Sequence, residues 1–273
     1  MNRPNLKNIK VFVLDLDGTF YIGDRLLPDS LRFIERVLET GRRFLFFTNN
    51  SSRTPAHYIE KLGRMGLAIT RADIVTSGDV CIDYLLKNHR EDAVYLMGTE
   101  ALREDFAAAG VRLAARGEDG AGDGDPAGLP DVVVCAFDTE LTYAKLERAC
   151  TYIRNGAAFL ATHEDINCPT EAGFIPDCGA FCAAVSLSTG KEPKYLGKPH
   201  AETLEKVMAL TGAAREELAF IGDRLYTDVA AGVLNGAAGL LVLSGETKIE
   251  DIQEYPVKPD AVFSGLGEIA DML

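Results

Sequence analysis

The chain has 273 residues, of which 47% are hydrophobic, and 28 Lys and Arg against 41 Asp and Glu give it a formal net charge of −13. This length suits one large or two moderate domains that need no disulfide bonds for stability, and the composition is that of a globular rather than a disordered protein. An acidic surface repels nucleic-acid phosphates and anionic lipid, which argues against sequence-independent nucleic-acid binding as the main function.

The cysteines and the apolar segments indicate a cytoplasmic protein with no membrane attachment. The six cysteines are Cys81, Cys135, Cys150, Cys168, Cys178 and Cys182. They show no zinc-ribbon spacing, and Cys178 and Cys182 stand four apart rather than as a CxxC pair, which favours reduced thiols. The amino-terminal apolar run breaks at Asp15 and Asp17, and no segment approaches about 18 to 20 consecutive apolar residues, so neither an export signal nor a membrane span is expected.

The amino-terminal part of the chain alternates buried strands with amphipathic helices. The β-branched and aromatic run IKVFVL ends at Asp15, as expected for a strand covered on both faces of a parallel sheet. Gly41 is the expected C-cap of the first helix, and Thr54 and Pro55 are the N-cap and first residue of the second. The elements expected here are a strand over 9–14, a helix over 30–41, a strand over 42–50 and a helix from 55 to 66.

The same alternation continues to the end of the chain, which predicts a doubly wound parallel sheet of the α/β class. Further strands are expected over 73–78, 92–98, 131–138, 157–163, 217–223 and 239–245. Residues 116–130 are rich in Gly and lack periodicity, so we expect a flexible surface loop there. Asp119, Asp123 and Asp125 in this loop lack the terminal Glu of a calcium-binding EF-hand, which argues against a calcium site.

Polar segments stand at the ends of expected strands or at the start of an expected helix. In open parallel sheets, ligands bind beyond the carboxyl ends of the strands. Taken singly, each segment is ordinary, since a carboxylate there is commonly a turn or N-cap residue and a lysine is commonly solvated. Their joint occurrence at ends that meet at one crevice indicates a site. The segments are Asp15-Leu16-Asp17-Gly18-Thr19, Thr48-Asn49-Asn50, Gly197-Lys198-Pro199 and Gly222 to Asp228.

Carboxylates gathered at one crevice repel one another unless a cation lies among them. An all-oxygen site with open positions for water suits Mg²⁺. Once the cation offsets the carboxylates, a hydroxyl, backbone N–H groups and an ammonium can hold three phosphoryl oxygens while a carboxylate attacks phosphorus. The residues therefore favour magnesium-dependent chemistry on a phosphate ester.

The four segments resemble, in order and spacing, the motifs of the haloacid dehalogenase (HAD) superfamily: DLDGT at 15–19, TNNSS at 48–52, GKP at 197–199 and GDRLYTD at 222–228. The TNNSS form, the long interval before GKP and the segment ATHEDINCPTEAGFIPDCGA at 161–180 are similar to the NagD subgroup with its type IIA cap. The resemblance covers essentially the whole chain. It implies a Rossmann-like core from residues 1–89 and 191–273 and an inserted α/β cap domain from residues 90–190.

The resemblance also implies a role for each motif residue. Asp15 would be the nucleophile that forms an aspartyl-phosphate, and Asp17 would protonate the leaving oxygen and then activate water. Thr48 and Lys198 would hold phosphoryl oxygens, and Lys198 would also restrain Asp15.

The implied metal ligands are the Asp15 carboxylate, the backbone carbonyl of Asp17 and Asp223, with Asp228 orienting the metal shell or Lys198. Asn49 and Asn50 join Thr48 as expected substrate-binding residues.

Substrate choice must depend on residues that contact the leaving alcohol, and in a capped enzyme these lie on the cap. Residues 163–167 (HEDIN) follow a strand-like segment, and Asp165 is the candidate substrate-binding residue; an ordinary turn fits this segment equally well. An enclosed site favours small phosphorylated metabolites, such as sugar phosphates, nucleotides or a phosphorylated cofactor, over phosphoproteins. A homo-oligomer that assembles through the cap is compatible with this organisation.

Other classes of function fit the sequence less well. A phospho-accepting receiver module would leave most of residues 90–190 unexplained and has no use for a second acid at Asp17. Halide needs no protonation to leave, so Asp17 and a metal cluster favour phosphate hydrolysis over carbon–halogen hydrolysis. A non-catalytic ligand-binding protein remains an alternative, although it would not need Asp15, Asp17, Lys198 and Asp223 together. No glycine fingerprint supports a nicotinamide cofactor.

Overall fold

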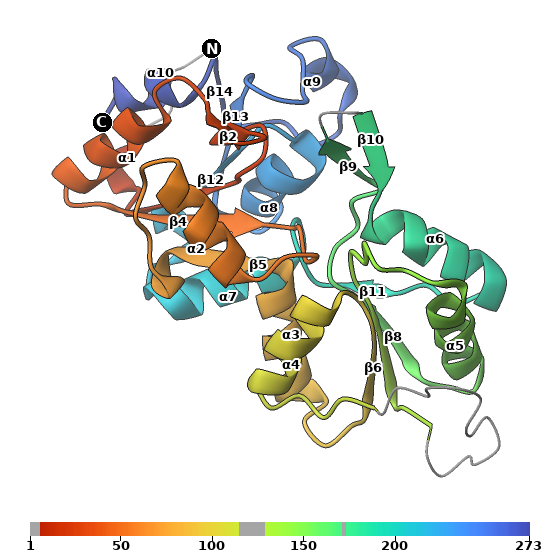
Figure 1. The fold of residues 1–273 in the computed structure, drawn as a ribbon. Coiled ribbons are helices and arrows are strands. Elements are labelled where there is room, and N and C mark those ends of the chain that lie inside the picture. Colours follow the sequence, from red (N-terminus) through yellow and green to blue (C-terminus); the bar gives the residue numbers. More distant parts are fainter. Residues whose placement is uncertain (1–5, 115–128, 171–172) are drawn as a thin grey trace. The chain divides into compact units, whose positions relative to one another are not determined.

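The computed structural model describes residues 6–114, 129–170 and 173–273 (Figure 1). The loop expected over 116–130 lies outside the described residues except for its last two positions. The chain divides into two compact units, each with a parallel sheet of its own. The first consists of Met1–Thr48, Pro55–Thr76 and Lys198–Leu273, and the second of Asn49–Thr54 and Ser77–Gly197. Within the described residues, no helix combines the length and hydropathy that a membrane crossing requires.

The first unit is built on a six-stranded parallel sheet with the order β14-β13-β12-β1-β4-β5. Every residue of the central strand β1 is buried, and Val11 pairs with Leu218 on one side and Arg43 on the other. This sheet confirms the predicted α/β class. Its strands are β1 (Val11–Leu14), β4 (Arg43–Thr48), β5 (Ile74–Thr76), β12 (Leu218–Gly222), β13 (Ala238–Val242) and β14 (Ala261–Phe263), with a small hairpin of β2 (Tyr21–Ile22) and β3 (Arg25–Leu26).

Helices connect the strands of this sheet. Gly41 adopts a φ of 71° directly after the C-cap Thr40, as a helix-ending glycine does. Pro199 is not the first residue of a helix, because the next helix begins at Ala201 with His200 as its N-cap. The α-helices are α1 (Ser30–Glu39), α2 (Pro55–Arg64), α7 (Ala201–Thr211), α8 (Ala230–Val233), α9 (Asp251–Glu254) and α10 (Leu266–Ala270). Short 3₁₀ helices are η1 (Leu6–Asn8), η2 (Arg71–Asp73) and η4 (Arg215–Glu217), and η5 (Leu225–Val229) is a π-helix.

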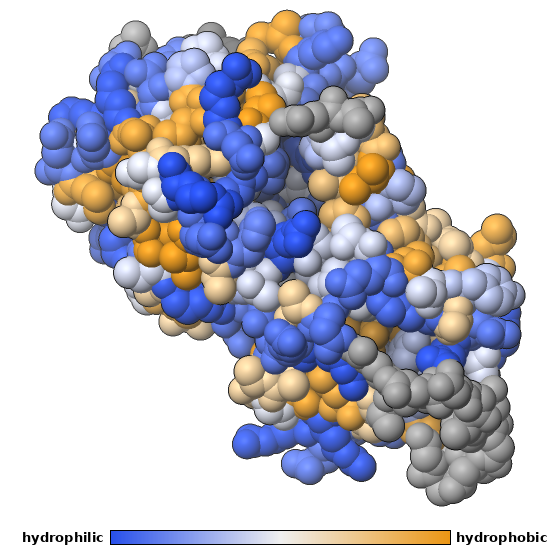
Figure 2. Space-filling model, in the orientation of Figure 1, coloured by the Kyte–Doolittle hydropathy of each residue, from blue (hydrophilic) through white to orange (hydrophobic). Residues whose placement is uncertain are grey.

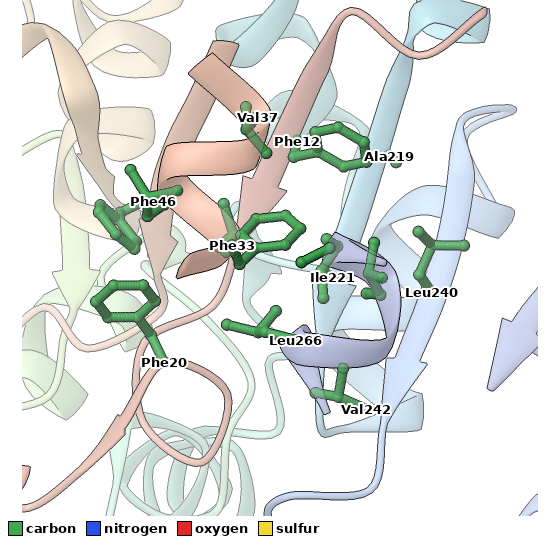
Figure 3. Packing of buried hydrophobic residues seen from close by; sticks show 14 of the residues in the cluster. Phe12, Phe20, Phe33, Val37, Phe46, Ala219, Ile221, Leu240, Val242 and Leu266 are labelled. Carbon is green, nitrogen blue, oxygen red and sulfur yellow. The ribbon is translucent and has the colours of Figure 1, made fainter. Parts of the chain in front are cut away.

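An aromatic and aliphatic cluster joins the sheet to α1 and α10 (Figure 3). Phe12 of β1 meets Phe33 of α1 edge to face, with 5.6 Å between ring centroids. Phe20, from the turn after β1, meets Phe46 of β4 in the same manner at 4.8 Å. Such pairs add about 0.5–1.5 kcal/mol each beyond the area that they bury. The turn after β1, which carries the first polar motif, is therefore anchored to the core by Phe20.

The second unit has its own four-stranded parallel sheet, with the order β11-β8-β7-β6, and its own apolar core. This folded unit accounts for the residues that a receiver module would leave unexplained. Its strands are β6 (Val94–Met97), β7 (Val132–Cys135), β8 (Ala158–Ala161) and β11 (Lys194–Tyr195), its hairpin is β9 (Asn167–Thr170) and β10 (Gly173–Pro176), and its helices are α3 (Ser77–Asn88), α4 (Glu100–Ala108), α5 (Tyr143–Arg154) and α6 (Cys178–Thr189).

The division differs from the boundaries expected at 89/90 and 190/191. Helix α3 belongs to the second unit, and its Cys81 is fully buried. Strand β11 also belongs there, because it pairs with β8. Residues 49–54 also belong to the second unit, where the carbonyl of Ser52 accepts a hydrogen bond from the Thr99 hydroxyl at 3.2 Å. These side-chain and strand contacts between distant residues leave no signal in the local sequence pattern.

Hydrophilic and apolar side chains are interspersed over the face drawn in Figure 2. Exposed apolar residues such as Leu38 on α1, which is 55% exposed, are ordinary on a globular protein. Ile34 and Val37 of the same helix are buried.

Candidate active site

The first unit brings several of the predicted site residues together at the carboxyl ends of neighbouring strands. Asp15 follows β1, Thr48 ends β4 and Asp223 follows β12. Strand β1 pairs with both of the other strands, so the three residues leave the sheet at the same edge. Each stands at the end of a run of buried apolar residues that fixes its position.

Lys198 is the centre of the arrangement. Its ammonium donates hydrogen bonds to Asp15 Oδ1 at 2.6 Å, to Asp228 Oδ1 at 2.6 Å and to the carbonyl of Phe47 at 3.1 Å. Lys198 is only 2% exposed, so these three acceptors replace its water. Burial alone would lower the pKa of Lys198, but the two carboxylates outweigh it and hold the pKa well above its ordinary value. The lysine is therefore charged.

Asp223 is held by close backbone packing. It accepts hydrogen bonds from the Thr19 hydroxyl at 3.1 Å and from the backbone N–H of Glu246 at 2.7 Å. A Cβ atom at Gly18 or at Gly245 would collide with its carboxylate, so both positions require glycine. Gly245 is the last residue of the strand predicted over 239–245. Because ligands bind beyond the ends of such strands, the same reasoning could have identified Gly245 from the sequence.

The donor atoms at this edge fit a hard divalent cation. Asp15, Asp223 and Asp228 each offer a carboxylate oxygen, and these oxygens lie within 4.8 Å of one another. Burial raises the pKa of Asp15 well above its ordinary value, and the neighbouring carboxylates Asp228 and Asp223 add to the rise, although Lys198 opposes it. Burial, and secondarily the charge of Asp228, raise the pKa of Asp223 to about 6. An Mg²⁺ ion would offset this charge through the oxygen ligands that it prefers.

The raised pKa of Asp223 predicts an unusual effect on stability. Because the folded pKa of about 6 exceeds the ordinary value of 3.8, the contribution of Asp223 to stability is present at low pH and is lost as the pH rises through 6. In EDTA at pH 7.5, we expect Asp223→Asn to raise the free energy of unfolding by about 1 kcal/mol. This is what remains of about 3 kcal/mol of relieved charge burial after the loss of a hydrogen bond.

Urea unfolding at pH 7.5 and pH 4 would measure this effect, with the exposed Asp24→Asn as the matched control. The gain should shrink toward pH 4. A variant less stable than the wild type at pH 7.5 would contradict the electrostatic interpretation.

Asp17 interacts with a different group of residues, Tyr21 and Lys61. The Tyr21 hydroxyl donates to Asp17 Oδ2 at 3.2 Å, and the Lys61 ammonium lies 3.8 Å from the centroid of the Tyr21 ring. Burial raises the pKa of Asp17, and the charge of Lys61 opposes that rise. A carboxyl group with a raised pKa is suited to donate a proton. The sequence motifs did not indicate Tyr21 or Lys61, because Lys61 reaches Tyr21 only through the packing of α2.

Asn49, Asn50 and Asp165 lie in the second unit rather than the first. The Asn49 amide donates to Asp165 Oδ2 at 3.1 Å, and Asp165 is only 4% exposed. Asn50 Oδ1 accepts hydrogen bonds from the backbone N–H and the hydroxyl of Ser52 at 3.0 and 2.7 Å. The structure thus connects Asn49 with Asp165 and gives Asn50 the role of a local turn residue.

His163 is fully buried in the second unit, and both of its ring nitrogens have polar partners. Its Nε2 lies 2.9 Å from Asp177 Oδ1, and its Nδ1 lies 3.0 Å from the Thr162 hydroxyl. Burial lowers the pKa of His163, but Asp177, together with Cys178 and Asp165, outweighs burial and brings the pKa to about 9. At neutral pH the ring is an imidazolium bonded to a carboxylate.

Two parts of the chain match sequence families. Residues 12–112 match the haloacid dehalogenase-like hydrolase family, and residues 195–269 match a HAD-hydrolase-like family. Among curated proteins, the chain is 32% identical over 263 residues to the 5′-nucleotidase YutF of Bacillus subtilis. The aligned region covers 96% of this chain and 98% of that protein. It is 33% identical over 263 residues to an acid sugar phosphatase of Staphylococcus aureus, with coverages of 96% and 97%.

Solved structures match over nearly the whole chain. A 4-nitrophenylphosphatase from Thermotoga maritima superposes with a TM-score of 0.89 at 42% identity, covering 97% of this chain and 98% of that one. A protein described as a putative NagD protein superposes with a TM-score of 0.87 at 38% identity, covering 97% and 99%.

Proposed function

The chain belongs to the haloacid dehalogenase-like hydrolase family, and from this premise we propose that it is a NagD-like phosphatase that hydrolyses phosphate monoesters of small metabolites with the help of Mg²⁺. The observation that carries the proposal is the hydrogen-bonded Lys198 between Asp15 and Asp228, with Asp223 beside them. Asp15, Asp223 and the backbone carbonyl of Asp17 would hold the ion, which supplies charge neutralisation for the incoming phosphate.

Asp15 is the proposed nucleophile. One of its carboxylate oxygens attacks phosphorus, the bond from phosphorus to the ester oxygen breaks, and an aspartyl-phosphate forms. Lys198 fixes the other oxygen through its 2.6 Å hydrogen bond and, with Thr48, binds phosphoryl oxygens.

Asp17 is the proposed acid and base. In the first step it gives a proton to the leaving alkoxide, and the raised pKa of its buried carboxyl group supports that role. In the second step the Asp17 carboxylate takes a proton from the water that attacks the aspartyl-phosphate, which releases inorganic phosphate and restores Asp15. Tyr21 holds one oxygen of Asp17 and leaves the other for this exchange.

The second unit is the proposed cap that selects the leaving group. The relatives named as a nucleotidase and as a sugar phosphatase share the phosphoryl group of their substrates and differ in the alcohol, so discrimination requires contacts beyond the phosphate. Asp165 acts here through Asn49, since its carboxylate accepts the amide of Asn49 and is itself buried. Sugar phosphates and nucleoside monophosphates are the proposed substrate class.

A panel of phosphate esters tests this proposal. We expect the purified protein to release phosphate from 4-nitrophenyl phosphate and from at least one sugar phosphate or nucleoside monophosphate. EDTA should abolish the activity and excess Mg²⁺ should restore it. Asp165→Ala should change the ranking of kcat/KM among the metabolites more than it changes the hydrolysis of the aryl ester. Full activity in EDTA would contradict the metal-dependent mechanism, and an unchanged ranking would place specificity elsewhere in the second unit.

A further inference from the structure

Three cysteines that stand far apart in the sequence converge inside the second unit. Cys135 ends β7, while Cys178 and Cys182 lie one turn apart on α6. Their Sγ atoms all lie within 4.8 Å of one another, and the Sγ atoms of Cys178 and Cys182 are 4.0 Å apart. All three residues have no exposed surface. The sulfurs thus form a compact triangle between a strand end and a helix.

The size of this triangle suits a metal ion at its centre. A typical zinc–sulfur bond is about 2.3 Å long, so three sulfurs arranged symmetrically around one ion lie about 4.0 Å from each other. The separation of Cys178 and Cys182 already has this value. Closing the triangle requires only a small movement of Cys135, whose thiol points at the carbonyl of Cys178 with a separation of 4.0 Å.

Groups that stabilise negative charge surround the sulfur of Cys178, whose thiol also donates to the carbonyl of Cys135 at 3.4 Å. Cys178 is the first residue of the twelve-residue helix α6, where the helix dipole stabilises negative charge. The Thr162 hydroxyl donates to its sulfur at 3.7 Å, and the same hydroxyl contacts the imidazolium of His163. Burial raises the pKa of Cys178, but hydrogen bonds from the thiols of Cys135 and Cys182 and the charge of His163 together hold it well below its ordinary value.

We propose that Cys135, Cys178 and Cys182 form a binding site for one thiophilic divalent cation of the Zn²⁺ and Cd²⁺ class, separate from the carboxylate site of the first unit. Soft thiolates select such ions, whereas Mg²⁺ takes oxygen ligands. The two sites therefore discriminate between metals by ligand chemistry.

Binding exchanges protons for the ion. Each of the three cysteines binds as a thiolate, so every thiol proton among them is released to solvent when a divalent cation enters, and three thiolates with one M²⁺ sum to a charge of −1.

The test uses the full chain, reduced, freed of metal with a chelator and refolded from urea in the presence of Cd²⁺ and excess Mg²⁺. Refolding gives the ion access to sulfurs that are buried in the native state. We expect one Cd²⁺ to be retained per chain after gel filtration, a thiolate-to-cadmium charge-transfer band in the ultraviolet spectrum, and a higher urea midpoint than without Cd²⁺. Zn²⁺ should compete for the same site and remove the band.

Cys178→Ser and Cys182→Ser should lose the band and the stabilisation. Cys150→Ser is the matched control, since Cys150 is a buried thiol of the same core but not of the triangle, and it should keep both. Circular dichroism checks that each variant folds. Absence of the band in the wild-type protein would overturn the proposal without recourse to any variant, as would a band that persists at full intensity in a folded Cys178→Ser protein.

Discussion

Replacing Asp15 by Asn is expected to lower kcat for 4-nitrophenyl phosphate by about four orders of magnitude or more. The amide oxygen is a far weaker nucleophile than a carboxylate, and loss of a covalent nucleophile is among the most damaging changes that an active site can suffer. The fold should survive, because Asn keeps the size of Asp15 and still accepts a hydrogen bond from Lys198. Steady-state kinetics with Mg²⁺ and a thermal unfolding curve would measure both effects.

Asp24→Asn, at an exposed position in the turn between β2 and β3, is the control and should retain wild-type kcat. Rapid quenching gives a second readout, because the wild-type protein should carry a phosphoryl group during turnover and Asp15→Asn should not. Wild-type kcat in Asp15→Asn would refute the covalent mechanism, whatever the other measurements show.

Replacing Lys198 by Met should damage both stability and turnover. The substitution preserves much of the aliphatic volume but leaves Asp15 and Asp228 without the ammonium that each contacts at 2.6 Å. Removing one partner of a buried ion pair typically costs about 3–5 kcal/mol, because the remaining charge is left uncompensated. We expect a loss of that order in the free energy of urea unfolding without Mg²⁺, together with loss of detectable kcat.

The double variant Lys198→Met, Asp228→Asn separates these two effects. It removes one of the two carboxylate charges that Lys198→Met leaves uncompensated, so it should recover part of the stability lost in Lys198→Met. Activity should stay absent, because Asp15 still has no lysine beside it. If the double variant were less stable than Lys198→Met by the full cost of Asp228→Asn alone, the two residues would not be coupled.

The proposed active-site edge of the first sheet could be predicted because the carboxyl ends of parallel strands lie at one edge, whatever their separation in the chain. Asp15, Thr48 and Asp223 each end an apolar run, and strands of one sheet place such ends together. Lys198 was identified by its motif rather than by a strand end. The contact between Lys61 and Tyr21 could not be predicted, since it depends on how α2 packs and not on any repeating pattern.

The second unit was predicted less completely for a related reason. Its strands β6, β7 and β8 are continuous apolar runs and were found, whereas the hairpin of β9 and β10 is largely exposed and has no such run. The cysteine triangle joins β7 to α6 across 43 positions of the chain. Spacing rules for metal sites describe ligands within one loop or turn, so they do not detect a triangle of this kind.

The position of β12 beside β1 has a consequence for the nascent chain on the ribosome. Strand β1 and its neighbour β4 are synthesised early, but the partner on the other side of β1 ends only at Gly222. At about 5–20 residues per second, roughly 10–35 s pass between the completion of β4 and that of β12. Throughout this interval β1 presents an open, wholly apolar edge, which is a template for pairing with other chains. All residues of the second unit are synthesised before β12 is complete, so this unit can fold before the first sheet has both partners of β1.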